Sequence, residues 1–147
     1  MARTAADRTR YVDEAMGFTP LEVEVMEKFL AGPNPILGAL RAQFRTASVK
    51  KREFTGVGFW LDIELAPDAV PARLSQSLHL TDVGAELEGV TRGIGFVLHV
   101  LGGQMSLLEG VTYNEPWPAH IGTFSVAYIR DGRHSEVRSD DIGALLG

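Results

Sequence analysis

Apolar side chains in the first third of the chain recur with the 3.6-residue period of a helix. The first stripe consists of Leu21, Val25, Met26, Phe29 and Leu30. Thr19-Pro20-Leu21-Glu22 predicts its start, because it combines a capping box with proline at the first helical position. Gly32-Pro33 ends this helix. Asn34-Pro35 repeats the cap-then-proline signal, so we expect a second helix to about Thr46 and a helical hairpin with a very short connection.

From residue 47 onward the apolar period changes to two. Residues 47–54 and 57–65 predict two strands joined through Thr55-Gly56. In the second strand apolar residues alternate with Trp60, Asp62 and Glu64, which indicates a half-buried strand with a solvent-facing row. Residues 67–77 contain two prolines and predict a loop.

The C-terminal half has the clearest strand pattern, at residues 78–80, 85–87, 94–101, 104–109 and 123–129. Both faces of 94–101 are nearly apolar, so we expect a central strand that is covered on both sides. Gly102-Gly103 predicts a type I′ hairpin turn.

Together these elements predict an α+β fold in which an N-terminal helical hairpin packs on a mainly antiparallel β-sheet. No linker or internal repeat divides the chain. We therefore expect a single domain over residues 1–147, with loosely packed tails at 1–17 and 131–147.

Composition narrows the classes of function. The chain has no cysteine, which excludes disulfides, thiolate nucleophiles and zinc–thiolate sites. Its formal net charge of −5 argues against nucleic-acid binding, and we interpret the basic run Lys50-Lys51-Arg52 as a solvated face. No apolar stretch approaches the roughly 20 residues of a membrane helix, and no secretory signal precedes the first helix. We expect a cytoplasmic protein that does not associate with membranes.

The polar residues show no catalytic, metal or cofactor motif. None of the four histidines lies two or four positions from another, so no metal site and no cofactor are predicted. His99 follows an apolar strand pattern, and we expect it to be a hydrogen-bonded core histidine, with His79 similar. No residue is predicted to be catalytic.

The most unusual segment is residues 108–118, which concentrates acids, aromatics and prolines after a strand. Pro116 and Pro118 fix an extended path. Tyr and Trp on a stiff backbone are effective binding anchors, because they lose little side-chain entropy. We therefore predict a partner-binding site made by Glu109, Tyr113, Glu115 and Trp117. In the alternative interpretation, Tyr113 and Trp117 cover one end of the sheet as part of the core.

Three stretches of the sequence also resemble those of a known group of proteins. They are residues 52–59 (REFTGVGF), the Gly95-Phe96 strand before Gly103, and the pattern LEGxTYxEPWP in residues 108–118. Together they resemble a widespread family of small bacterial proteins, over most of residues 21–128. Members are short cytoplasmic proteins of unassigned activity, so the resemblance supports the α+β architecture and implies no catalytic residue.

The leading hypothesis is a non-enzymatic protein-binding module, in particular an immunity-type inhibitor of a bacterial toxin. Small size, acidity and the loop at 108–118 favour it, because an acidic inhibitor is attracted to a basic nuclease at long range. The alternative is a small-molecule-binding or hydrolytic domain in which a carboxylate/His cleft beside the sheet is lined by His99, Glu109, Tyr113 and Glu115. Self-association through an exposed sheet edge is a third hypothesis.

Overall fold

The computed structural model describes residues 17–146, apart from the side chain of Ala144. The expected tail at 1–17 thus lies outside the described residues except for Gly17. The elements in chain order are α2 (Pro20–Phe29), α3 (Pro35–Phe44), β1 (Ser48–Phe54), β2 (Gly58–Glu64), β3 (Leu78–Leu87), β4 (Ile94–Leu101), β5 (Gln104–Thr112), β6 (Phe124–Arg130), β7 (Arg133–Ser135) and α4 (Ile142–Leu146). The predicted α+β class is confirmed.

Both long helices begin where the local sequence predicts. Thr19 N donates to Glu22 Oε1 at 2.9 Å, and Glu22 N donates to Thr19 Oγ1 at 3.2 Å, which completes the capping box. Asn34 Oδ1 accepts a hydrogen bond from Ile36 N at 2.8 Å. Helix α3 ends at Phe44, slightly before the expected end at Thr46.

All neighbouring strands of the seven-stranded sheet are antiparallel, in the order β1-β2-β5-β4-β3-β6-β7. The predicted Gly102-Gly103 turn joins β4 to β5, with φ values of 58° and 77°. A second tight turn at Asp131-Gly132, with φ values of 53° and 75°, joins β6 to β7. Strand β7 and helix α4 lie in the segment 131–147, for which the sequence indicates a tail.

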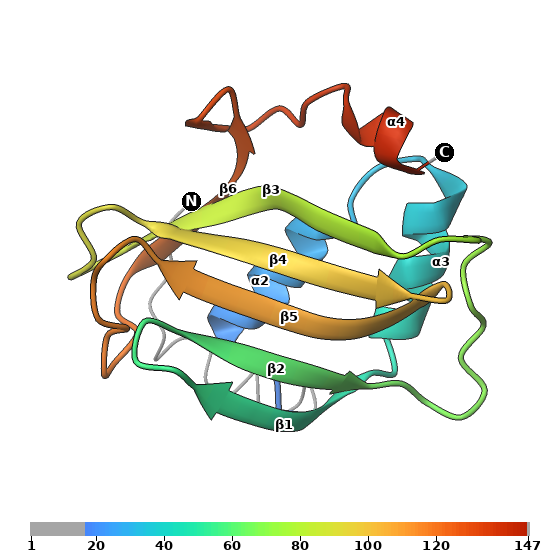
Figure 1. Cartoon of the computed structure of the whole chain (residues 1–147), viewed down its shortest axis with the longest axis horizontal. Coiled ribbons are helices and arrows are strands. Elements are labelled where there is room, and N and C mark those ends of the chain that lie inside the picture. Colours follow the sequence, from blue (N-terminus) through green and yellow to red (C-terminus); the bar gives the residue numbers. More distant parts are fainter. Residues whose placement is uncertain (1–16, 147) are drawn as a thin grey trace.

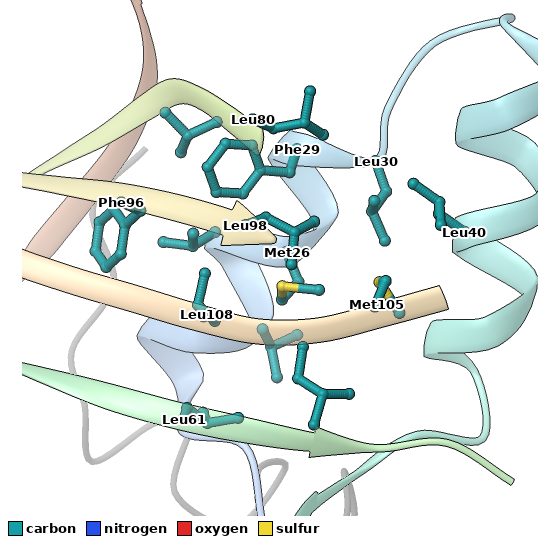
Figure 2. Packing of buried hydrophobic residues seen from close by; sticks show 14 of the residues in the cluster. Met26, Phe29, Leu30, Leu40, Leu61, Leu80, Phe96, Leu98, Met105 and Leu108 are labelled. Atoms are coloured by element: carbon teal, nitrogen blue, oxygen red, sulfur yellow. The ribbon is translucent and has the colours of Figure 1, made fainter. Parts of the chain in front are cut away.

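Helices α2 and α3 lie on the same face of the sheet (Figure 1). Between these layers the buried apolar side chains form a core, which includes Met26, Phe29, Leu40, Leu61, Phe96, Leu98 and Leu108 (Figure 2). Burial of these apolar side chains between the sheet and the two helices stabilises the packing of the helices on the sheet.

The opposite face of the sheet is not covered by any described helix (Figure 1). Strand β4 is central, as expected, but the prediction that both of its faces are covered is wrong. Val97 and His99 are only half-buried and Leu101 is 49% exposed. An apolar strand pattern records which residues share a face, but it does not reveal whether another layer packs on that face.

Candidate functional site

We call the side of the sheet that no helix within residues 17–146 covers the outer face. Its described members include Lys51, Glu53, Trp60, Asp62, Glu64, His79, Glu86, Val97, His99, Leu101, Leu107, Glu109, Val111 and, just after β5, Tyr113. Large apolar side chains on it are strongly exposed: Trp60 by 53%, Tyr113 by 46% and Val111 by 41%. Exposed apolar groups gathered on one surface indicate an interaction site more than isolated ones do.

Tyr113 lies across the outer face above a glycine. A Cβ atom built on Gly95 would lie 2.4 Å from the Tyr113 hydroxyl oxygen, so only glycine leaves room for the ring in this position. Gly95 pairs with Gly84 on β3, so two neighbouring positions carry no side chain, and with Val111 on β5. The space above Gly95 gives the Tyr113 side chain a defined position while it remains half exposed.

Glu109, His99 and His79 form a hydrogen-bonded chain across the outer face. Glu109 Oε1 lies 2.9 Å from His99 Nε2, and His99 Nδ1 lies 2.7 Å from His79 Nδ1. The strand register brings them together, because His79 is the direct cross-strand partner of His99, while Glu109 pairs with Val97 two positions away. His99 is therefore hydrogen-bonded, as expected, but it lies on the open face instead of in the core.

The chemistry of Glu109, His99 and His79 decides which atom donates each of these two hydrogen bonds. A carboxylate only accepts hydrogen bonds, so His99 donates from Nε2 to Glu109. With both rings neutral, the lone pair of His99 lies on Nδ1, which accepts from Nδ1–H of His79. These tautomers are assigned from the hydrogen bonds, for neutral rings.

Glu115 is turned away from this chain and holds two loops together. Its carboxylate accepts hydrogen bonds from the backbone N–H groups of Thr91 and Arg92, both at 2.8 Å. These two bonds stabilise the ionised form and lower the pKa of Glu115 below its ordinary value. The carboxylate therefore ties the β3–β4 connection to the segment after β5.

We expect Glu115→Gln to lower the free energy of unfolding at neutral pH, because neutral glutamine replaces a doubly hydrogen-bonded carboxylate. The lowered pKa means that this contribution is present above the unfolded-state pKa of Glu115 and is lost as pH falls through its folded-state pKa. The difference between variant and wild type should therefore shrink in acid, as measured by urea unfolding at several pH values. Glu64→Gln, at an exposed position of β2, is the control, and a Glu115→Gln difference that does not depend on pH would contradict the prediction.

Trp117 packs against the core at the start of β2. Its ring meets Phe59 edge-on at a centroid distance of 5.2 Å, and its backbone N–H donates to Gly56 O at 2.8 Å. The side chain is half-buried. Trp117 thus covers one end of the sheet, whereas Tyr113 lies on the outer face.

The structure therefore separates the four residues of the predicted site. Glu109 and Tyr113 share the outer face, while Glu115 and Trp117 support the loops beside it. Sequence reasoning missed Trp60 as a candidate, although its alternation with Asp62 indicates an exposed row. It also missed the contact between His79 and His99, which no local pattern reveals.

Three further observations bear on function. None of the helices within residues 17–146 has the length and apolar character needed to cross a bilayer. A cavity of about 570 Å³ lies between the α2–α3 connection and the C-terminal segment, and neither His99 nor Glu109 lines it.

Neither a family model, nor a curated protein, nor a solved structure matches this chain.

Proposed function

We propose that this protein is a non-enzymatic module that binds another protein through its outer face. The observation that carries the proposal is the exposure of Trp60, Val111 and Tyr113 on the outer face. Aromatic side chains dominate the energetics of protein interfaces, and those near the centre of a contact contribute most. The space above Gly95 supports this role, because Tyr113 is already held in position before a partner arrives.

The charges around these apolar residues favour a basic partner. Asp62, Glu64 and Glu86 are exposed on the outer face, and the chain carries a formal net charge of −5. Lys51, on the same face opposite Asp62, is paired with Glu53 at 2.8 Å. Such an arrangement accelerates association with a positively charged surface and disfavours acidic partners. An immunity-type inhibitor of a basic bacterial toxin is the particular function that we propose.

The β1 edge of the sheet is less suited to pairing with a second copy. Strand β1 forms one edge, carries Lys50 and Lys51, and shifts its register between Val49 and Lys51. Lysines and irregular register are features that protect edge strands from pairing with other chains. These features favour contact through the outer face over contact through β1.

The hydrogen-bonded Glu109–His99–His79 chain supports a second candidate function, a small-molecule-binding or hydrolytic domain. A carboxylate that orients a histidine is the arrangement used to prepare a general base. These three side chains lie on an open surface, however, and enzymes generally need a concave site that excludes water. Protein binding is therefore the better-supported proposal.

The test is affinity capture of a basic partner from native lysate, comparing wild type with Trp60→Ala/Tyr113→Ala. Loss of two central aromatic anchors should weaken binding by roughly 30-fold or more. Capture should also weaken as the salt concentration rises, because screening removes the long-range attraction. Trp117 is left intact, since its substitution would disturb the packing on Phe59.

The matched control is Val70→Ala/Val137→Ala, which removes two exposed apolar side chains outside the outer face. Circular dichroism and thermal unfolding must first show that both variants fold like wild type. The proposal predicts that the control retains the partner. Equal retention by both variants would show that the outer face is not the contact surface.

A further inference from the structure

The cross-strand pair of His79 and His99 has the features of a metal-binding site. The two Nδ1 atoms face each other at 2.7 Å, with the rings nearly perpendicular at an interplanar angle of 76°. His79 is exposed and the His99 side chain retains 23% exposure, so ions in solvent reach both rings. Two nitrogen ligands thus converge on one point of the open surface.

Glu109 prepares one of these ligands. By accepting the Nε2–H of His99 at 2.9 Å, it leaves the Nδ1 lone pair of His99 directed at His79. Histidines that bind metals usually donate their other ring N–H to a carboxylate, which fixes the tautomer and increases the basicity of the ligand. Glu109 is therefore a positioning residue.

We infer that His79 and His99 together bind a divalent transition-metal ion of the class that prefers imidazole, such as Zn²⁺ or Ni²⁺. Binding requires the His79 proton to move from Nδ1 to Nε2, so that both Nδ1 atoms present lone pairs. The two nitrogens must separate to about 3.3 Å to suit metal–nitrogen bonds of roughly 2.0–2.1 Å in tetrahedral geometry. His79 is free to make this small movement because its ring is exposed.

The site has two protein ligands, and water completes the coordination. The described residues contain no group of three or more metal-ligating side chains, so the pair binds as an open site and not as a closed structural one. Acidic side chains on the same face, including Asp62 and Glu86, raise the local concentration of cations. A buried hydrophobic row beneath holds the two strands in register.

The test titrates the untagged full chain with Zn²⁺ alone and with Ni²⁺ alone, by calorimetry and by ¹⁵N NMR of the histidine rings. One ion per chain should bind, and His79 should change from the Nδ1–H to the Nε2–H tautomer. His79→Ala and His99→Ala should each weaken binding at least tenfold. Glu109→Leu should weaken it roughly tenfold, and Glu109→Gln, which retains an acceptor oxygen, by less.

The two remaining histidines supply the matched control. His120 and His134 are exposed and lie outside the pair, so His120→Ala/His134→Ala should bind Zn²⁺ as wild type does. Affinity should fall in acid, because protons compete for the same nitrogen lone pairs. The inference is overturned if wild type takes up no ion, if His79→Ala binds as tightly as wild type, or if the control variant loses binding. None of these results depends on the protein partner.

Discussion

Arg52→Met is expected to lower the free energy of unfolding by about 3 kcal/mol. Arg52 Nε and Nη2 donate to the two carboxylate oxygens of Glu22, at 2.9 and 2.5 Å, and Nη2 also donates to Gly17 O at 2.9 Å. Glu22 is only 3% exposed. Removing the arginine would leave a buried carboxylate at the start of α2 without its countercharge.

The magnitude follows from comparing the buried pair with an exposed one. Breaking a buried pair by removing one partner generally costs about 3–5 kcal/mol, and Arg52 keeps 21% side-chain exposure, so the lower end applies. The neighbouring pair of Lys51 and Glu53 is more than half exposed on both sides, and solvent-exposed pairs of this kind contribute little to stability. Lys51→Met is therefore the matched control on the same strand.

Urea unfolding of the two single variants measures this difference. A double-mutant cycle with Glu22→Gln isolates the pair, because glutamine can keep the capping contact with Thr19 while it removes the charge. In the Glu22→Gln background, Arg52→Met should lower the free energy of unfolding by much less than it does in wild type. If Arg52→Met lowers the free energy of unfolding by no more than Lys51→Met does, the Arg52–Glu22 ion pair does not stabilise the contact between α2 and β1.

Gln43→Leu is expected to lower the free energy of unfolding by about 3 kcal/mol. The Gln43 side chain is 1% exposed, its Nε2 donates to Val70 O and Gly103 O at 3.0 and 2.8 Å, and its Oε1 accepts from Met105 N at 3.0 Å. Leucine has a similar size but satisfies none of these groups. Gly103 O keeps the hydrogen bond from Ala72 N, so the main losses are at Val70 O and Met105 N–H.

Chemical denaturation and amide hydrogen exchange measure the effect of Gln43→Leu. The Met105 amide should exchange faster in the variant, because its acceptor has been removed. Gln104→Leu, at an exposed position beside the same turn, should change stability by no more than about 0.5 kcal/mol. A Gln43→Leu variant as stable as the control would show that this side chain does not connect α3 to the β4–β5 turn.

Much of the fold could be predicted because its signals are local. The capping box at Thr19–Glu22 and the cap at Asn34 depend on residues two or three positions apart. The Gly102-Gly103 turn requires positive φ at adjacent residues, which glycine adopts without strain. The alternation along β2 sets Trp60 and Phe59 on opposite faces whatever the strand pairs with.

The candidate site could be predicted only in part. The segment 108–118 drew attention to Glu109 and Tyr113, which do lie on the outer face. The same segment also contains Glu115 and Trp117, which do not lie on the outer face. Glu115 accepts hydrogen bonds from backbone N–H groups of the β3–β4 connection, and Trp117 packs on Phe59. Neighbours along an irregular loop can point in different directions, because its backbone follows no fixed period.

Sequence by itself determined helices α2 and α3 and strands β1 to β6, although it divided β3 in two, and it determined which side chains share a face. It did not predict β7 or α4. Only the tertiary structure decided that no described helix covers one face of β4, that His79 meets His99 twenty positions away, and that Arg52 reaches Glu22 thirty positions before it. Periodicity and capping arise from contacts within a turn or a strand, where chain geometry fixes the neighbours. Strand register and layer packing join distant segments, so they depend on the whole set of competing contacts at once.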